Sequence, residues 1–160
     1  MENYKFSTAT LADIPKILAL YDSLRNLPNC AWDSEYPNED NVKSDIAQDS
    51  LYKLTDEIGQ IVATISATPA DELGGMDWDL ENPCEVARLG VLPSQQNKGL
   101  GGLILRHTIT EVQQRGFDGI IMLVNKGNPA ALALYKKNGF LVCGEGFLWE
   151  VDFFRLWLRF

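Results

Sequence analysis

The sequence predicts a mixed α/β domain, of the α+β type, in which strands and helices alternate along one chain of 160 residues. Apolar residues recur at helical spacing over 11–26 and 99–115, which predicts two amphipathic helices. Runs rich in β-branched residues over 51–54 and 58–68 predict two antiparallel strands. A continuous apolar run over 120–124 predicts a strand that is covered on both faces.

The first half of the chain is expected to hold a strand, two helices and a hairpin. Residues 4–8 alternate as a strand does, and Thr10 is placed to cap the helix that follows. The segment 27–40 mixes Pro, Asn and Asp with Trp32 and Tyr36, which is typical of a loop. These two aromatics either cover the core from the loop or line a pocket for a substrate. A second helix is expected over 39–48.

The second half continues with an acidic loop, a strand over 85–91 and a helix that Gly116 ends. The loop is expected to be solvated, and alternatively its carboxylates steer a cationic substrate; they are Asp71, Glu72, Asp77, Asp79 and Glu81. After the strand over 120–124 comes another helix, and alternating aromatic and aliphatic residues then predict two last strands. The turn between them is expected within 144–152.

Composition narrows the class of protein. The formal net charge of −8 disfavours nucleic acid or an anionic membrane as a partner, since both select clustered Lys and Arg. Three scattered cysteines without a CxxC pair suit reduced thiols, and the single histidine has no cluster to join, so no metal site is expected. Without a leader-like or bilayer-length apolar stretch, residues 1–160 are expected to form one soluble, cytoplasmic domain.

The stretch LGVLPSQQNKGLGG, residues 89–102, combines a strand that stops at a proline, a polar turn and glycines that open a helix. Glycines let a backbone press against a ligand, and the free N–H groups of a helix start favour an anion such as phosphate. A P-loop is excluded because Lys98 precedes Gly99, and a dinucleotide fingerprint is excluded because no G-x-G-x-x-G follows an early strand.

A second stretch, NPAALALYKKNGF, forms a helix with both ends marked. Asn128 stands at the N-cap, Pro129 at the first helical position and Gly139 just past the end. Together the two stretches resemble the two motifs of the GNAT superfamily of acyl-coenzyme A-dependent N-acyltransferases. The first resembles its pyrophosphate loop, Gln/Arg-x-x-Gly-x-Gly/Ala after Val-x-Pro, and the second resembles its pattern Asn-x-x-Ala-x-x-x-Tyr-x-x-x-Gly-Phe.

The resemblance implies a mixed, mostly antiparallel sheet of about seven strands with helices on both faces. It also implies that the strands holding 89–91 and 120–124 are parallel and splay apart around acetyl-CoA, the expected co-substrate. The residues that would bind the coenzyme are Leu89, Gly90, Val91, Gln96, Asn97, Lys98, Gly99, Leu100, Gly101, Gly102, Asn128 and Tyr135. Asn97 stands where the family frequently has glycine, and asparagine tolerates left-handed backbone better than most residues.

For the chemistry, the resemblance assigns Tyr135 as the general acid for the leaving thiolate, and the Val91 N–H could polarise the thioester carbonyl. Tyr135 is otherwise a packed helix tyrosine. Glu85 is a candidate base, on the same strand face as Leu89 by alternation, or else a solvated edge residue; a water chain or another carboxylate is the alternative base. Arg88 is expected to be structural or a surface ion-pair partner.

The acceptor is expected to be a primary amine of a small molecule or a protein. The resemblance places acceptor selectivity in the early helix-loop region, here with Trp32 and Tyr36, and in the aromatics of the late strands, 147–154. Those late strands could also pair with a second subunit in a homodimer. The alternative function is a non-catalytic acyl-CoA-binding or interaction module that keeps the same fold.

Overall fold

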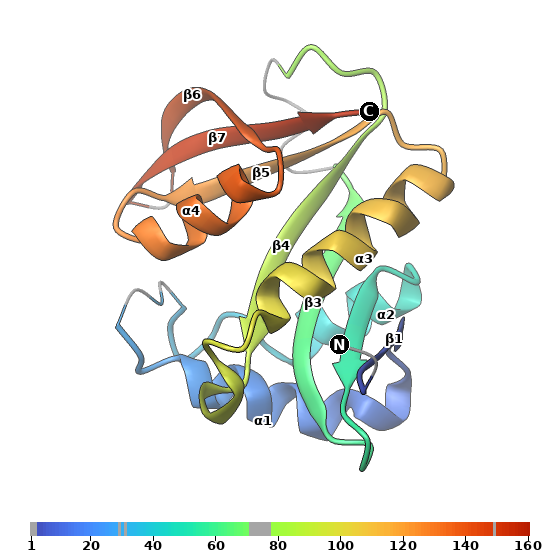
Figure 1. Ribbon diagram of the computed structural model, residues 1–160. Helices are drawn as coiled ribbons and strands as arrows, with labels where there is room; N and C mark the ends of the chain where they lie inside the picture. The colour runs from blue at the N-terminus through green and yellow to red at the C-terminus, as the bar shows by residue number, and fades with distance from the viewer. Residues whose placement is uncertain (1–2, 29, 31, 71–77, 149) are drawn as a thin grey trace.

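The computed structural model describes residues 3–28, 30, 32–70, 78–148 and 150–160. One seven-stranded sheet runs through the molecule in the order β1-β2-β3-β4-β5-β7-β6 (Figure 1). Every neighbouring pair is antiparallel except β4 and β5, which are parallel. The strands are β1 (Lys5–Thr8), β2 (Leu51–Thr55), β3 (Ile61–Pro69), β4 (Pro83–Val91), β5 (Gly119–Asn125), β6 (Leu141–Leu148) and β7 (Val151–Arg159). This confirms the predicted fold class.

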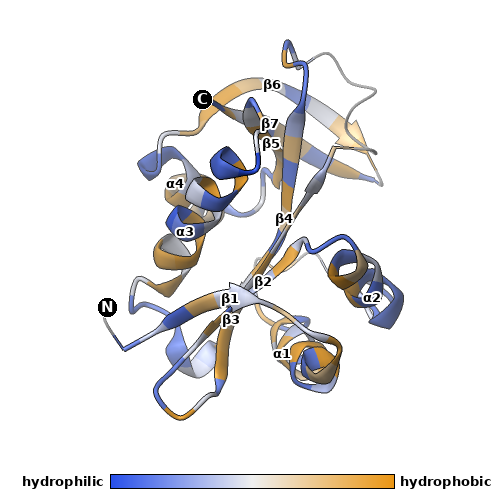
Figure 2. Cartoon of the chain, turned by 90° about the vertical axis from the view of Figure 1, so that its right-hand side faces the viewer, coloured by the Kyte–Doolittle hydropathy of each residue, from blue (hydrophilic) through white to orange (hydrophobic). Residues whose placement is uncertain are grey.

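Helices cover both faces of the sheet. They are α1 (Ile14–Leu24), α2 (Glu39–Ala47), α3 (Leu100–Gln114) and α4 (Pro129–Lys137), with short 3₁₀ turns η1 (Leu11–Asp13) and η3 (Pro93–Gln95). Figure 2 shows α1 and α2 on one side of the sheet and α3 and α4 on the other. In the part of the chain that the structure describes, no helix combines the length and the apolar character that crossing a bilayer would need.

Each face of the sheet has its own apolar core. The core under α3 contains Ile65, Ile104 and Phe140, all at most 1% exposed. The core under α1 contains Ile17, Tyr21 and other residues that the helical spacing placed on one face. Four of the five residues of the 120–124 run in β5 are buried, as its continuous apolar pattern predicted. One face of this strand belongs to the core under α3, and the other face to a third cluster that contains Ile121 and Trp78.

Two element starts differ from the expectation for local reasons. The Asp13 carboxylate accepts the Thr10 N–H at 2.8 Å, so the expected cap exists, but a 3₁₀ turn comes first and α1 begins at Ile14. The strand expected from 58 begins at Ile61, because the Asp56 carboxylate accepts the N–H groups of residues 58 and 60 and holds a turn.

The parallel pair β4–β5 diverges along its length. The ladder joins 83–85 to 119–121 and stops there, while β4 continues to Val91 along β3. Figure 1 shows the two strands separating beyond this paired end. The expected splay is therefore present. Beyond residue 85, one edge of β4 pairs with β3, and its other edge faces the opening.

A bulge in β4 corrects one expectation about Glu85. The β3–β4 register shifts between Thr64 and Ser66, and Arg88 at the bulge has a left-handed φ of 54°. Cys84 and Val86 belong to the core under α3, and Leu89 packs against the same core. Glu85, between Cys84 and Val86, therefore faces α1 and α2. Simple alternation placed Glu85 and Leu89 on one face, and this was wrong because the bulge adds a residue between them.

Candidate functional site

The free edge of β4 is the first part of the site. The Leu92 N–H donates to the Val62 carbonyl at 2.9 Å, so the peptide group of Leu92 faces β3. Because peptide groups alternate along a strand, the N–H and C=O of Val91 face the opposite edge, toward the opening. Leu89, two residues earlier, shares that orientation. This edge offers hydrogen-bonding groups to an extended ligand in the way that a sheet edge accepts another strand.

The loop that follows β4 turns sharply by means of two left-handed residues. Asn97 has a φ of 64° and Gly99 a φ of 79°, and the latter is the N-cap of α3. The asparagine at position 97 thus adopts the left-handed conformation, which this residue type tolerates better than most. The Gln96 side chain donates from Nε2 to the Val91 carbonyl at 3.2 Å, and the Lys98 ammonium donates to the Gln95 side chain at 3.1 Å. The loop is therefore attached to the open edge of β4.

The first turn of α3 presents N–H groups beside that edge. The Leu103 N–H donates to the Gly99 carbonyl at 3.1 Å, so the N–H groups of residues 100–102 precede the first intrahelical bond. A Cβ at Gly101 would lie 3.4 Å from Leu134 of α4 and 3.8 Å from the Val91 side chain. The missing side chain therefore leaves space where β4, α3 and α4 approach one another, and the helix start can bind an anion there.

The N-terminus of α4 is fixed by its own cap. The Asn128 side chain accepts the Ala131 N–H at 3.1 Å, and Pro129 fills the first turn. That bond uses the amide oxygen of Asn128 and leaves its NH₂ group as the donor available for a ligand. The expected binding residue is thus also a structural one.

Tyr135 lies on α4, partly buried against the core that Leu89 and Val91 also contact. Its ring meets Phe140 edge-on, with 5.8 Å between ring centroids. Burial raises the pKa of Tyr135 to about 12, so its hydroxyl keeps its proton at neutral pH. Among the hydrogen bonds of the described residues, none involves this hydroxyl, which leaves it able to donate to a ligand.

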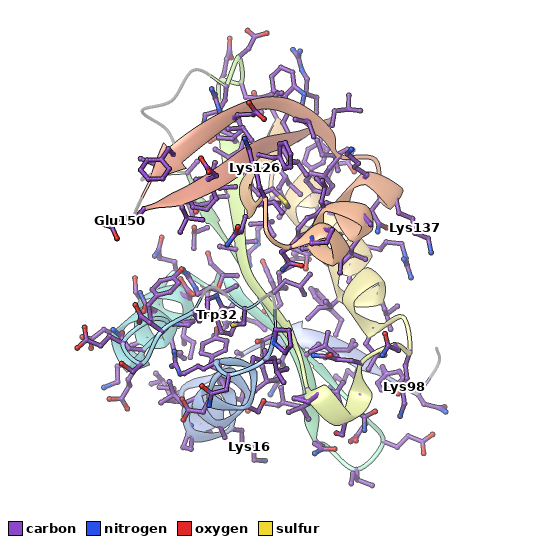
Figure 3. All side chains as sticks on the ribbon, turned by 90° about the vertical axis from the view of Figure 1, so that its left-hand side faces the viewer. Lys16, Trp32, Lys98, Lys126, Lys137 and Glu150 are labelled. Carbon is purple, nitrogen blue, oxygen red and sulfur yellow. The ribbon has the colours of Figure 1, made fainter. Side chains whose placement is uncertain are left out.

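The two sides of the sheet carry different groups around the opening. Figure 3 shows Lys98 and Lys137 on the side of α3 and α4, and Trp32 on the other side of β4. Cations beside the helix start suit a phosphate-bearing ligand, in a chain whose net charge is −8. A ligand entering between α3 and α4 leaves the α1–α2 side for a second substrate.

Trp32 covers the core from the loop, which is one of the two interpretations of the loop aromatics. Its ring packs edge-on against buried Tyr21, with centroids 5.2 Å apart, so it covers the core under α1. It also lies 3.6 Å from where a Cβ of Gly90 would stand. This brings the loop against residues 89–91, which we call the cleft half of β4. Tyr36 is 41% exposed, and its hydroxyl accepts a hydrogen bond from Arg88 at 2.9 Å.

Two arginines hold this region together, and their partners could not be found from sequence. Arg88 forms a mostly buried ion pair with Asp45 of α2 at 2.7 Å, where a structural role or a surface pair was expected. Arg25 donates to backbone carbonyls of Asp33, Tyr36 and Pro37 in the loop. Arg25 also has a local ion pair with Asp22, but no local pattern marks its bonds to the loop carbonyls or the partners of Asp45, which lie far along the chain.

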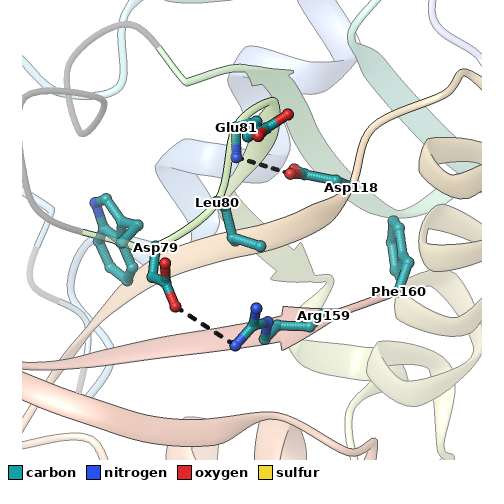
Figure 4. A pocket seen from close by; sticks show the side chains of 7 residues that line it. Asp79, Leu80, Glu81, Asp118, Arg159 and Phe160 are labelled. Carbon is teal, nitrogen blue, oxygen red and sulfur yellow. Dashed lines mark hydrogen bonds and ion pairs between the residues drawn. The ribbon is translucent and has the colours of Figure 1, made fainter.

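A separate hollow of about 590 Å³ lies at the paired end of β4 and β5, away from the open edge (Figure 4). It is lined by Trp78, Asp79, Leu80, Glu81, Asp118, Arg159 and Phe160. The Asp118 carboxylate there accepts backbone N–H groups of residues 81 and 82 and so fixes the strand start. Asp71, Glu72 and Asp77 of the acidic loop lie outside the described residues. Within the described residues, no three or more His, Cys, Asp or Glu side chains are grouped to hold a metal ion.

Comparison with known proteins identifies related sequences. The model of the acetyltransferase (GNAT) family matches residues 18–140. A mycothiol acetyltransferase of Nocardia farcinica is 30% identical over 123 residues, which are 73% of this chain and 40% of that protein. The chain thus spans well under half the length of that relative.

One further relative and one solved structure match more of their own length. An L-methionine sulfoximine/L-methionine sulfone acetyltransferase of Pseudomonas aeruginosa is 26% identical over 144 residues, covering 86% of this chain and 80% of that protein. The structure of yncA from Salmonella typhimurium with its cofactor acetyl-CoA has a TM-score of 0.77 and 20% identity, and covers 98% of this chain and 94% of that one. The last similarity shows a shared fold.

Proposed function

The chain belongs to the acetyltransferase (GNAT) family. We propose that it is an acyltransferase that transfers an acetyl group from acetyl-CoA to a primary amine. The observation that carries this proposal is the open edge of β4 beside the start of α3. Together they offer strand-like pairing and a phosphate site along one continuous line. A pantetheine arm joined to a pyrophosphate has this shape and this order of groups.

In this arrangement the backbone of Leu89 and Val91 pairs with the pantetheine arm, on either side of Gly90. The loop and the first turn of α3, residues 96–102, surround the pyrophosphate with N–H groups, and the Lys98 ammonium adds charge attraction. The Asn128 NH₂ group donates to the arm from the side of α4. The thioester then lies near Tyr135.

The reaction needs three events at the thioester. The neutral amine nitrogen attacks the carbonyl carbon, whose oxygen accepts a hydrogen bond from the Val91 N–H at the open edge. The carbon–sulfur bond breaks, and the departing sulfur takes the proton of the Tyr135 hydroxyl. The nitrogen loses a proton to solvent and the base, and Tyr135 regains a proton from solvent, so the products are the N-acetylated amine and free coenzyme A.

Glu85 is the proposed base and acts through water. It faces the α1–α2 side, from which the acceptor approaches, but it lies six residues before Val91, whose N–H receives the thioester oxygen. That is about 20 Å along a strand, so a proton from the amine reaches the carboxylate by way of a chain of solvent molecules. The proposed base thus combines two of the candidates named from sequence, Glu85 and a water chain.

The acceptor is a small-molecule or protein amine that binds between the α1–α2 loop and the late strands. The related enzymes named above have small-molecule acceptors by name, and the loop carrying Trp32 and Tyr36 contacts β4 at the open edge. A second candidate function is an acyl-CoA-binding module without catalysis. The position of Tyr135 argues against it, because a module that only binds coenzyme A needs no proton donor near the sulfur.

The experiment is release of coenzyme A thiol from acetyl-CoA across a panel of amino acids, polyamines, aminoglycosides and peptide amines, with acetylated products identified by mass. The exposed thiol of Cys143 contributes a background that the amine-free reaction measures. Amine-dependent release with a matching acetylated product supports the enzyme. Binding of acetyl-CoA without acetylation of any amine supports the binding module.

A further inference from the structure

A polar cluster joins the bulge of β4 to the loop between α1 and α2. We call Arg88, Asp45, Tyr36 and Ser66 the Arg88 cluster. The Arg88 guanidinium donates to the Asp45 carboxylate at 2.7 Å and to the Tyr36 hydroxyl at 2.9 Å. The Ser66 hydroxyl of β3 donates to the same oxygen of Asp45 at 2.6 Å. One side chain thus connects a strand, a helix and a loop.

Arg88 stands at the bulge that determines which edge the peptide groups of the cleft half of β4 face. It has the left-handed φ of 54° at the bulge, and the direction of the following strand residues changes there. Leu89 and Val91 turn their N–H groups toward the opening only because of this extra residue. A guanidinium anchored to a buried carboxylate fixes the bulge from the α2 side, with the Arg88 side chain 14% exposed and that of Asp45 5% exposed.

The same guanidinium also contacts the loop between α1 and α2. Its carbon lies 5.8 Å from the centre of the Tyr36 ring, and the Tyr36 backbone carbonyl is held from the other side by Arg25 at 2.7 Å. The N–H groups of Glu35 and Tyr36 both donate to the Asp33 carboxylate at 2.8 Å. The loop is therefore internally ordered, and the hydrogen bond from Arg88 to the Tyr36 hydroxyl joins it to β4.

The cluster is poorly suited to stability alone. Nε of Arg88 is buried without a hydrogen-bond partner among the described residues, and the hydroxyls of Tyr21 and Thr64 are buried beside each other next to it. Thr64 pairs across the sheet with Gly90, so these atoms surround the cleft half of β4. Unpaired buried groups and buried ion pairs weaken a fold relative to apolar packing, which favours a functional reason for their presence.

We propose that Arg88 is a positioning residue that aligns the acceptor with the cleft half of β4 through its hydrogen bond to Tyr36. Tyr36 fixes the α1–α2 loop against β4, and Asp45 fixes the guanidinium. The loop and the strand that binds the thioester are thereby held in one relative position. This inference rests on the proposed acetyl transfer to an amine.

The kinetic test uses Tyr36→Phe, Arg88→Lys and the double variant, each assayed with the amine that the screen identifies. Tyr36→Phe removes one hydrogen bond to a charged group and is expected to lower kcat/KM for the amine about tenfold, with KM for acetyl-CoA unchanged. Adding Tyr36→Phe to Arg88→Lys is expected to cause no further loss, since the second change removes a bond already lost. Additive losses, or an unchanged kcat/KM for the amine, would overturn the proposal.

The matched control is Lys53→Gln. Lys53 forms an ion pair with Asp13 of the same length, 2.7 Å, and of similar burial at 18% and 13% exposure, but on β2 away from the cleft. It is expected to leave kcat/KM for the amine and KM for acetyl-CoA unchanged. A purely structural role for Arg88 would make Arg88→Lys behave as Lys53→Gln does, with a lower melting temperature and no change in kcat/KM for the amine.

Hydrogen exchange gives a test that needs no activity. Arg88→Lys is expected to speed exchange at the N–H groups of Glu35 and Tyr36 in the loop and of Gly90 and Leu92 in β4, while Lys53→Gln leaves them unchanged. Unchanged exchange at both segments in Arg88→Lys would overturn the proposal even if acetylation is observed. Absence of acetylation by the wild type, with faster exchange in Arg88→Lys, would instead contradict the proposed function alone.

Discussion

The Gln96 side chain donates a hydrogen bond to the carbonyl oxygen of Val91 at 3.2 Å, across five residues of a sharply turning loop. The acceptor atom belongs to the edge of β4 that faces the opening rather than β3. The bond therefore ties the candidate phosphate loop to the candidate pantetheine edge. It fixes the distance between the two halves of the proposed coenzyme site before any ligand arrives.

Replacing Gln96 by alanine should weaken acetyl-CoA binding while leaving the fold intact. Gln96 is exposed, and loss of one neutral hydrogen bond corresponds to about 1 kcal/mol, or roughly a fivefold higher Kd. Calorimetry with acetyl-CoA measures the change. Gln113→Ala is the control, because Gln113 is exposed near the far end of α3; equal affinities for both variants would contradict the anchoring role.

Replacing Tyr135 by phenylalanine should lower kcat by about 10²-fold, the usual contribution of a general acid. The ring still packs against Phe140, so the affinity for acetyl-CoA should stay the same. Thiol release under saturating acetyl-CoA gives kcat, and calorimetry gives Kd. Tyr4→Phe provides the comparison, because Tyr4 also packs partly buried against the same core but lies near the N-terminus, outside the two motifs. Unchanged turnover in Tyr135→Phe would remove this residue from the mechanism.

Replacing Glu85 by glutamine should reduce the rate most strongly near neutral pH. A primary amine has a pKa of about 10, so at pH 7 it must lose a proton before attack, and the variant lacks the group that receives it. The rate of the variant should recover toward that of the wild type as pH rises to about 9. Glu81→Gln, an exposed acid at the far end of β4, should show a wild-type profile; a constant ratio of variant to wild-type rates at every pH would exclude Glu85 as a base.

The buried tyrosines predict loss of stability in alkaline solution. Burial raises the pKa of Tyr52 to about 12, above the value of 10.0 for an unburied tyrosine. Between these values the unfolded chain loses the proton first, so stability is retained below pH 10 and falls as pH rises toward 12. Tyr21 and Cys84 have pKa values raised to about 12 for the same reason.

Tyr52→Phe tests this directly, because the Tyr52 hydroxyl is buried without a partner among the described residues. The variant should equal or exceed the wild type in free energy of unfolding at pH 7.5, and should exceed it by about 1 kcal/mol more at pH 11. Urea unfolding at both pH values measures the difference. An identical decline with pH in both proteins would show that Tyr52 ionises equally in the folded and unfolded states.

The sequence predicted most of the fold because its signals were local. Asn128, Pro129 and Gly139 mark a helix by short-range chemistry, and the apolar run of 120–124 records burial on both faces. The left-handed backbone at Asn97 and Gly99 also follows from residue type. The loop, the helix start and Tyr135 could therefore be proposed as one site, once two motifs had been matched to a family.

The features of the fold and the site that sequence did not predict depend on contacts between distant parts of the chain. The bulge at Arg88 is stabilised by Asp45, 43 residues away in sequence, and nothing in the residues around 88 announces an inserted residue. Alternation therefore failed at Glu85. Likewise, Arg25 acts on backbone carbonyls, for which no side-chain pattern exists, and the acceptor side is built from a loop whose shape such contacts determine.

The most direct test of the central claim is calorimetric titration of the wild type and of Gly101→Glu with acetyl-CoA. A glutamate in the first turn of α3 is compatible with the helix dipole, and its Cβ would meet Leu134 at an ordinary 3.4 Å, so the variant should fold. Its carboxylate would repel a pyrophosphate. The account predicts micromolar binding by the wild type and loss of binding in the variant at an unchanged melting temperature. No heat of binding by the wild type at high micromolar acetyl-CoA, or equal affinities for both proteins, would contradict it.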